Sequence, residues 1–310
     1  MSAIDSLQSR LKAGEVIIMD GGTGTEIQRR DIPMGAVTWS GEPLLASLET
    51  VRAIHEDYIR AGAEIIITNS FATGRASLER AGLGDRTTEL NRLAVRLAQE
   101  ARDNVASDRP VFIAGSMSTF LPKLDATVTP SYEAALADYR EQSQILAEAG
   151  ADLILIEMLI RTVDAKAAVE AATATGLPTW VGFSCQNDNG QLFLGVHGKW
   201  GRETIPEAVE AVASEGVSAM FIMHTLSEDT GQGLRELGQG SSLPIGAYAH
   251  TGDFSDPNWV FDNSISSQGY LQYAQEWVNM GAQIIGGCCG ITPEHIRVLK
   301  ENLPTRRSGT

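Results

Sequence analysis

The chain has 310 residues, of which 43% are hydrophobic and 20% are charged, and its formal net charge is −15 at pH 7. It contains no apolar run near the ~18 residues that a membrane-spanning helix needs, and it lacks the clustered Lys and Arg that binding to nucleic acid or anionic membranes requires. These properties favour a soluble globular protein. The acidic charge fits small neutral or cationic partners, and ordinary solubility is an equally good explanation of it.

The N-terminal segment, MSAIDSLQSRLKAGE, has neither the basic start nor the apolar centre of a secretory signal. The chain has three cysteines, which make a poor disulfide framework. Both features predict a cytoplasmic protein with reduced thiols. The sequence leaves the choice between a monomer and a homo-oligomer open.

Apolar runs rich in Val, Ile and Ala alternate with helical patterns along the chain. Four of these runs follow a glycine that ends a helix, in RAGAEIIITNSF, EAGADLILIEML, SEGVSAMFIMHT and NMGAQIIGGCCG. Glycine is typical just past a helix C-terminus, and a run that is apolar on both faces is typical of a buried parallel strand. The full set of expected strands lies near residues 15–20, 64–69, 111–116, 151–157, 179–185, 217–224, 244–250 and 283–288.

Each of the eight expected strands is followed by a helical stretch. In the helix before the second strand, Val51, Ile54 and Tyr58 share one face that would pack on a sheet. Eight βα units in a chain somewhat above ~250 residues predict a single (β/α)8 or TIM barrel, with its active site where the strands end. A doubly wound open sheet is the alternative, because periodicity does not reveal closure. No low-complexity linker divides the chain, so one domain over residues 1–310 is expected.

Polar and ionisable side chains gather at the C-terminal ends of the expected strands, which would converge on one mouth of the barrel. Any one of them could be a satisfied polar group, but their coincidence on one face favours a functional site. They are Asp20, Asn69, Ser116, Glu157, Cys185, His224, His250, Cys288 and Cys289.

The loop after the first strand, DGGTGTE at residues 20–26, has neither the GxGxxG spacing nor the GKS or GKT ending of nucleotide-binding loops. Its glycines, Gly21 and Gly22, would instead let backbone amides approach a ligand, with Asp20 accepting from a substrate ammonium. A plain turn with an exposed Asp20 is the alternative. Trp39, farther along the chain, could present its aromatic face to a cationic group.

Cys288 and Cys289 lie side by side between glycines in IIGGCCGITPEHI. Thiolates are strong zinc ligands, and a catalytic zinc has three protein ligands and one open position. The flanking glycines allow both side chains to point inward, where regular strand alternation would separate them. The pair therefore predicts a zinc site, against the alternative that one cysteine packs as a small hydrophobic residue.

Together these segments resemble the homocysteine S-methyltransferase family, whose members transfer methyl groups to homocysteine from betaine, S-methylmethionine or cobalamin. The resemblance runs over nearly the whole chain, through DGGTGTE, AGAEIIITNSF, ADLILIEML, GFSCQNDNGQLFLG and, most specifically, IIGGCCGITPEHI. It implies a (β/α)8 barrel in which three cysteines hold a zinc that binds the homocysteine thiol.

Carried over position by position, the resemblance implies roles for residues of this chain. Cys288 and Cys289 match the paired zinc ligands of the family. Asp20 and Glu157 match acidic active-site residues that hold the amino-acid part of homocysteine. Substrate-lining positions of the family are matched by Trp39, Thr68, Asn69, Ser70 and Phe71.

The chain departs from the family at two strand ends. The family's first zinc cysteine ends strand six in GVNC or GINC, but this chain reads FIMH and has His224 there. At strand seven the family reads PNSGE or similar, whereas this chain reads AHTGD and has His250 in place of Asn. Because a Cys2His zinc site is a known arrangement, His224 is the expected third ligand, with His250 and Cys185 as the other residues considered.

The exchange of a thiolate for a neutral His changes the charge of the expected site. Three thiolates with Zn²⁺ carry one net negative charge, whereas two thiolates, a neutral His and Zn²⁺ carry none. The lower negative charge should ease deprotonation of a substrate thiol but make its sulfur a weaker nucleophile. A reactive sulfonium is therefore expected as the methyl donor in preference to an ammonium betaine.

The favoured function is zinc-dependent transfer of a methyl group from a sulfonium or betaine-type donor to the thiol of homocysteine, giving methionine. Two alternatives stay open. A metal at His224, His250 and a carboxylate could activate water, with Glu157 as base, in a hydrolase or lyase. The chain could also be a binding protein that has kept the pocket and lost catalysis.

Overall fold

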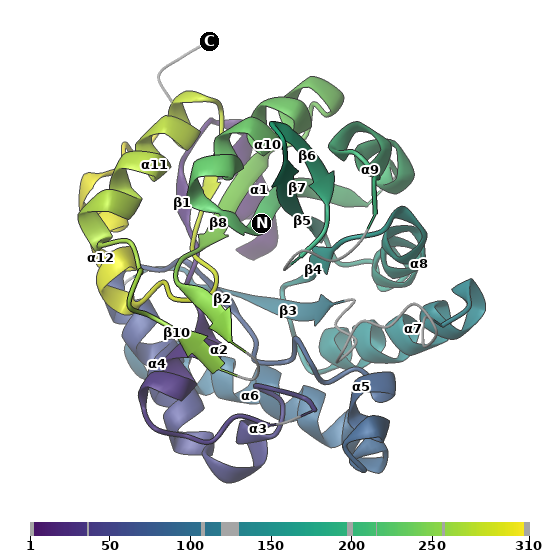
Figure 1. Cartoon of the computed structure of the whole chain (residues 1–310). Helices are drawn as coiled ribbons and strands as arrows, with labels where there is room; N and C mark the ends of the chain where they lie inside the picture. Colours follow the sequence, from purple (N-terminus) through teal and green to yellow (C-terminus); the bar gives the residue numbers. More distant parts are fainter. Residues whose placement is uncertain are drawn as a thin grey trace.

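Eight parallel strands form a barrel inside a ring of helices (Figure 1). The computed structural model describes residues 3–35, 37–106, 109–118, 130–196, 201–214, 216–255 and 258–306. Neighbouring barrel strands follow the order β1, β11, β8, β7, β5, β4, β3, β2. Their bounds are β1 (Ile17–Ile18), β2 (Ile65–Ile67), β3 (Phe112–Ser118), β4 (Leu153–Leu159), β5 (Thr179–Asp188), β7 (Val217–Leu226), β8 (Ile245–His250) and β11 (Ile284–Ile285).

The first and last strands of this order, β1 and β2, meet and close the barrel. Met19, just after β1, pairs in parallel with Ile65 of β2. The Glu64 amide donates to the Ile18 carbonyl at 2.7 Å, and the amide after Met19 donates to the Ile65 carbonyl at 3.0 Å. The predicted (β/α)8 barrel is confirmed, and the alternative of an open doubly wound sheet is wrong.

Helices connect the strands around the outside of the barrel. None of the described helices is both long and apolar enough to cross a bilayer. Their bounds are α1 (Ala3–Lys12), α2 (Thr23–Arg29), α3 (Pro43–Ala46), α4 (Leu48–Ala61), α5 (Arg75–Arg80), the short 3₁₀ helix η1 (Gly84–Arg86), α6 (Thr87–Val105), α7 (Tyr132–Glu148), α8 (Thr162–Thr173), α9 (Ile205–Val212), α10 (Ser227–Gly240), α11 (Ser267–Asn279) and α12 (Pro293–Asn302).

The glycines that were expected to end helices have backbone conformations that favour glycine. The φ angles of Gly62, Gly150, Gly216 and Gly281 are 111°, 93°, 103° and 106°. A side chain in this left-handed region would crowd the backbone, so glycine is the residue that turns the chain from helix to strand most easily. These four residues therefore set where β2, β4, β7 and β11 begin.

The hydrophobic core has two layers, one on each side of the barrel wall. Outside the wall, the α4 side chains of Val51, Ile54 and Tyr58 are buried, as their spacing predicted. Inside the wall, inward-pointing strand residues pack with Leu7 and Leu11 of α1. The side chain of Gln283, just before β11, donates to the Leu11 carbonyl at 2.6 Å, so α1 covers the N-terminal ends of the strands.

Two antiparallel hairpins extend beyond the eight βα units. Strand β6 (Gln191–Leu194) folds back on the end of β5, with Cys185 opposite Leu194. Strands β9 (Asp253–Ser255) and β10 (Asn258–Val260) form a separate pair after β8. Both hairpins follow the C-terminal ends of barrel strands, which is where a TIM barrel carries its active site.

Candidate metal centre and acid pair

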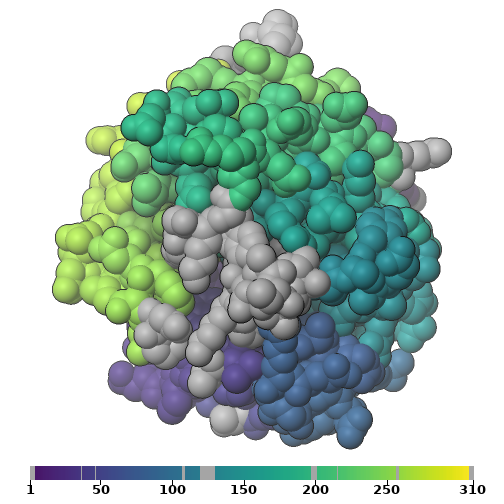
Figure 2. Space-filling model, turned by 45° about the vertical axis from the view of Figure 1, so that its right-hand side comes forward, coloured from purple at the N-terminus to yellow at the C-terminus, as the bar shows by residue number. Residues whose placement is uncertain are grey.

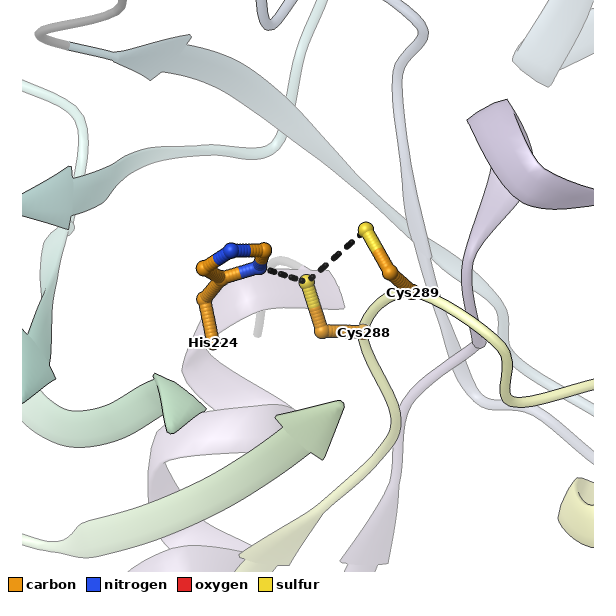
Figure 3. A group of neighbouring side chains, drawn as sticks. All are labelled: His224, Cys288 and Cys289. Atoms are coloured by element: carbon orange, nitrogen blue, oxygen red, sulfur yellow. Dashed lines mark hydrogen bonds between the residues drawn. The ribbon is translucent and has the colours of Figure 1, made fainter. Parts of the chain in front are cut away.

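A histidine and two cysteines meet at the C-terminal mouth of the barrel (Figure 3). His224 lies near the end of β7, and Cys288 and Cys289 follow β11. The His224 Nδ1 atom is 3.3 Å from the Cys288 Sγ atom, and the two Sγ atoms are 3.9 Å apart. Within the described ranges, these three side chains form the one group of His, Cys, Asp or Glu arranged to hold a metal ion, with ligand atoms within 4.8 Å of one another.

The spacing of these three atoms suits a tetrahedral metal with soft ligands. Two sulfurs at ~2.3 Å from a zinc ion and at a tetrahedral angle are about 3.8 Å apart, and a sulfur and a nitrogen are about 3.5 Å apart. The corresponding separations here are 3.9 Å and 3.3 Å. Two of the three separations therefore match those of a tetrahedral site, and all the donor atoms of His224, Cys288 and Cys289 lie within 4.8 Å of one another.

The Cys289 thiol is difficult to ionise without a cation nearby. Burial raises the pKa of the Cys289 thiol, and the neighbouring Cys288 raises it further. Two thiolates side by side in a buried site would repel one another. A metal ion removes this obstacle, because a coordinating thiol loses its proton to the metal's charge.

A bulge in β7 directs His224 into the mouth. The residue has a φ angle of 44°, and the pairing of β7 with β8 shifts register between Met223 and Leu226. The Ser184 hydroxyl donates to the His224 carbonyl at 3.0 Å, and the Thr225 hydroxyl donates to the Met223 carbonyl at 2.8 Å. Such a strained backbone persists only where its surroundings hold it, and it is frequent at functional sites.

Glycines shape the loop that carries the two cysteines. A side chain at Gly287 would collide with Ile291, and one at Gly290, whose φ angle is 81°, would collide with Thr251. The loop is also tied to β8, because the Cys288 amide donates to the Ala249 carbonyl at 2.8 Å. The sequence IIGGCCG thus forms a tight turn against β8 that brings both sulfurs close to His224.

Two carboxyl groups are buried in the same mouth. Asp20 is fully buried, and its Oδ2 atom accepts a 2.8 Å hydrogen bond from the Ile67 amide, whereas its Oδ1 atom has no hydrogen-bond partner. Burial raises the pKa of Asp20, and the charge of Glu157 raises it further. Burial also raises the pKa of Glu157 to about 7, although the Ser116 hydroxyl donates to this carboxylate. The pair is suited to receive a positively charged group.

The loop after β2 lies against the strand that carries Ser116. The Thr68 hydroxyl accepts a 2.9 Å hydrogen bond from the Ser116 amide and lies 2.7 Å from the Ser70 hydroxyl. The Asn69 side chain donates to a carbonyl on the neighbouring loop at 2.9 Å, and the Phe71 carbonyl accepts from Ser118 at 2.7 Å. The protein's own hydrogen bonds thus hold residues 68–71 in place, and their contact with a substrate stays a prediction.

The glycines after Asp20 have a packing role that the sequence did not suggest. A Cβ atom at Gly21 would lie 2.8 Å from the Tyr58 hydroxyl, and one at Gly22 would lie 2.6 Å from the Cys288 carbonyl oxygen. The Gly22 amide already donates to the protein backbone at 3.0 Å. These glycines let the Asp20 loop lie directly on the cysteine loop, and their contact with a ligand stays a prediction.

Trp39 is half-buried and has a φ angle of 46°. Its ring occupies the space beside Gly24, where a Cβ atom would be 2.6 Å from the ring atom Cζ3. The indole nitrogen is buried and has no hydrogen-bond partner. The side chain is therefore held by α2 and keeps an unused donor, and its contact with a substrate is a further prediction.

His250 and Cys185 are not members of the metal-binding group. The His250 ring lies beside that of His224, with 4.8 Å between ring centroids and an angle of 37° between the ring planes. Cys185 is buried in the β5–β6 hairpin, and burial raises the pKa of its thiol. The hydrolase alternative needs a metal at His224, His250 and a carboxylate, with Glu157 as base, and no group of this composition is arranged to hold an ion among the residues that the structure describes.

One side chain near the buried acids, that of Tyr248, was not predicted from the sequence. Tyr248 of β8 is buried inside the barrel, and its hydroxyl lies close enough to Glu157 to lower the pKa of that carboxyl group. The tyrosine lies in a buried strand, where an aromatic residue is ordinarily a core residue. The inward direction of alternate β8 residues was the signal that could have identified it.

A closed (β/α)8 barrel whose mouth brings a His/Cys/Cys group together with two buried acids of raised pKa has the features of an enzyme active site. Residues 17–303 match the family model described as homocysteine S-methyltransferase. The chain belongs to this family, and the resemblance drawn from its motifs is confirmed. It is therefore a methyltransferase.

Known proteins similar to the chain match it over most of its length. Homocysteine S-methyltransferase 3 of Zea mays is 30% identical over 317 residues, which cover 94% of this chain and 91% of the maize protein. Selenocysteine Se-methyltransferase of Brassica oleracea var. italica is 28% identical, and the match covers 98% of this chain and 93% of the Brassica protein. The metallated crystal structure of the homocysteine methyltransferase MmuM from Escherichia coli has a TM-score of 0.78 and 26% identity, covering 97% of this chain and 99% of MmuM.

Proposed function

We propose that this chain transfers a methyl group from a cationic donor to the thiol of homocysteine, giving methionine. The observation that carries the proposal is the presence of His224, Cys288 and Cys289 in the same barrel mouth as Asp20 and Glu157. Homocysteine has a thiol and an ammonium group, so one molecule can use both parts of the mouth. The substrates are small molecules, and a reducing cytoplasm, where thiols stay free, is the proposed compartment.

The proposed metal is zinc, held by His224, Cys288 and Cys289. When bound, zinc supplies a positive charge that lowers the pKa of a substrate thiol from its free value of about 8.5, so that thiolate is available at neutral pH. The chain's part is to present three donor atoms, one from strand β7 and two from the loop after β11. A zinc held by three protein ligands would have a position open for the substrate.

Asp20 and Glu157 hold the ammonium group of the acceptor. The unpartnered Oδ1 atom of Asp20 needs a donor, and a buried acceptor without one is costly. An ammonium between the two acids also offsets the repulsion that raises the pKa of Asp20. Trp39, Gly21, Gly22 and residues 68–71 would line the remaining surface of the substrate.

The methyl transfer needs no general acid. The sulfur lone pair of the acceptor forms a bond to the methyl carbon, while the bond from that carbon to the positively charged sulfur or nitrogen of the donor breaks. The leaving group departs as a neutral sulfide or amine. Because opposite charges are neutralised in the transition state, a mouth that excludes water favours the reaction, and holding both substrates together replaces a bimolecular encounter.

A sulfonium is the proposed donor in preference to an ammonium betaine. With His224 in place of a thiolate, the ligand set of this chain carries one negative charge fewer than three cysteines would. A less electron-rich centre makes the acceptor sulfur a weaker nucleophile, so the better leaving group of a sulfonium is needed. Higher kcat/KM for glycine betaine than for S-methylmethionine would contradict this choice.

The test is methionine formation from homocysteine with S-methylmethionine or glycine betaine as donor. Replacing Cys289 by Ala should remove metal binding and methyl transfer together. Replacing Cys185 by Ala is the matched control, because Cys185 is equally a buried cysteine but lies outside the metal group, and it should leave both unchanged. A metal-loaded, folded protein that forms no methionine with either donor would refute the proposal.

A further inference from the structure

The β9–β10 hairpin places one buried aromatic residue at the barrel mouth. Asp253, Phe254, Ser255, Asn258 and Val260 of this hairpin are all exposed, whereas Trp259 is only 4% exposed. An exposed two-stranded hairpin has little stability of its own. Among the described residues of this hairpin, Trp259 is therefore the one that packs into the barrel.

The Trp259 ring is packed against the two histidines of the mouth. Its centroid is 5.8 Å from that of His224, with an angle of 89° between the ring planes, and 5.4 Å from that of His250. The two histidine rings are 4.8 Å apart. His224 thus has one aromatic neighbour edge-on and another tilted beside it, and both limit how its ring can rotate.

The side chain of Gln28, on α2, forms hydrogen bonds with the backbone of Trp259. The Gln28 Nε2 atom donates to the Trp259 carbonyl at 2.8 Å, and the Trp259 amide donates to the Gln28 Oε1 atom at 2.9 Å. Next to this contact, the Arg29 guanidinium lies 3.6 Å from the centroid of the Phe261 ring. Figure 1 shows β10 beside α2, and in Figure 2 the yellow-green surface of this region borders the purple N-terminal segment.

We propose that Gln28 is a positioning residue for the metal ligand His224, acting through Trp259. The role rests on the metal centre of the proposed function. A cysteine needs only one side-chain torsion to aim its sulfur, whereas a histidine must fix two torsions to aim its Nδ1 atom at the ion. A chain with His224 in this position therefore needs packing that a cysteine would not, and the Trp259 ring supplies it.

The two hydrogen bonds of Gln28 suit this role. Because they engage the amide and the carbonyl of one residue, they fix both the position and the orientation of the Trp259 backbone. Groups that orient a metal-binding histidine typically change metal affinity by roughly 10- to 100-fold when they are removed. Loss of the Gln28 side chain should thus be detected at the metal and not only in the stability of the fold.

The experiment measures how fast the protein releases zinc to a chromophoric chelator, together with the visible absorption spectrum of the cobalt-substituted protein. Gln28→Leu should release zinc at least roughly tenfold faster than the original chain and shift the cobalt bands. Gln28→Glu, which keeps the acceptor but not the donor, should fall between them. The matched control is Gln144→Leu on the outside of α7, where the lost hydrogen bond is to Glu148, and its release rate should stay within about twofold.

Trp259→Leu separates the proposed pathway from a general loss of stability. It should speed zinc release as Gln28→Leu does. The zinc-release rate of the double variant should be close to that of either single variant, because both changes act on one pathway. Unchanged release and unchanged cobalt bands in Gln28→Leu would overturn the proposal, as would faster release with an unaltered spectrum and a lowered Tm. If the original chain binds no zinc or cobalt at all, the metal centre of the proposed function fails first.

Discussion

At the scale of single residues, the mouth of the barrel contains buried acids that no basic side chain neutralises. Among the ion pairs of the described residues, none involves Asp20 or Glu157. Burying a carboxylate without a partner is strongly unfavourable. We interpret the missing positive charge as that of the substrate.

Asp20→Asn should weaken acceptor binding while leaving the metal in place. A hydrogen bond to a charged group contributes about 1.5 to 3 kcal/mol, so the KM for homocysteine should rise roughly 10- to 100-fold. Asp152→Asn is the matched control, because the Asp152 carboxylate also accepts from a backbone amide, that of Ile113 at 2.7 Å, but lies before β4 at the other end of the barrel. Equal KM values for the two variants would argue against an ammonium site at Asp20.

Two substitutions at His224 test its role as a ligand. His224→Ala removes one of the three donor atoms and should release the metal, as measured by metal analysis after dialysis. His224→Cys supplies a thiolate instead and should retain the metal. If zinc affinity and transfer rate instead fell sharply in His224→Cys, the histidine would have some role other than metal binding.

A buried histidine outside the mouth should make the stability of the fold depend on pH. His55 on α4 is fully buried, neither ring nitrogen has a hydrogen-bond partner, and burial lowers its pKa to about 4. The unfolded chain binds this proton below about pH 6.5 and the folded chain only below about pH 4. Stability linked to His55 is therefore present above pH 6.5 and is lost as the pH falls towards 4.

The measurement is the free energy of unfolding in urea at about pH 7.5 and about pH 5. The folded chain should lose about 2 kcal/mol through His55 over this interval. His55→Leu removes the contribution of His55 and leaves the carboxyl groups unchanged. Between about pH 7.5 and about pH 5, the unfolding free energy of this variant should therefore fall by about 2 kcal/mol less than that of the original chain. Parallel curves for the two proteins would show that His55 is protonated equally in the folded and unfolded chains.

At the scale of elements, the glycine-flanked loops control how β1 and β11 present their functional residues. Gly287→Ala would force a Cβ atom against Ile291 in the cysteine loop, and overpacking of this kind destabilises by about 1 to 3 kcal/mol. Gly238→Ala should instead stabilise the fold, because alanine favours helix more than glycine does. Gly238 lies in α10, and an added Cβ atom would have its nearest neighbour at 3.6 Å, which is an ordinary contact. Equal thermal shifts in the two variants would contradict the packing argument.

The elements that were predictable from the sequence are those with strong apolar runs. The eight barrel strands fall where the runs predicted them, because a strand buried on both faces must be apolar throughout. The β5–β6 hairpin was not predicted, although its turn at Asn189 and Gly190, with φ angles of 53° and 88°, is typical of a two-residue hairpin. The β9–β10 hairpin has three-residue strands, which are too short to show a period.

The site was predictable where adjacency in sequence implied proximity in space. Cys288 and Cys289 are neighbours in the chain, and the barrel topology accounts for their meeting with His224. The bulge that turns His224 inward, and the contact of Gln28 with a residue 231 positions away, depend on backbone geometry and tertiary packing. Neither leaves a local pattern in the sequence, so neither could be predicted from it.

At the scale of the whole molecule, the pairing of the first and last barrel strands brings two distant segments of the chain together at the mouth. Strand β1 pairs with β11, so the loop that carries Asp20 lies against the loop that carries the cysteines. The acceptor's ammonium and thiol would therefore bind loops that are far apart in sequence but adjacent in the fold. The expectation of one domain over residues 1–310 stays a prediction.

The most direct test of the metal centre is a zinc-edge X-ray absorption spectrum of the purified protein, recorded with and without homocysteine and paired with metal analysis. One zinc per chain with two sulfur neighbours and a nitrogen, from Cys288, Cys289 and His224, is the predicted result, with one further sulfur on addition of homocysteine. A protein without tightly held zinc, or a zinc whose neighbours do not change when homocysteine is added, would contradict thiol activation by this site.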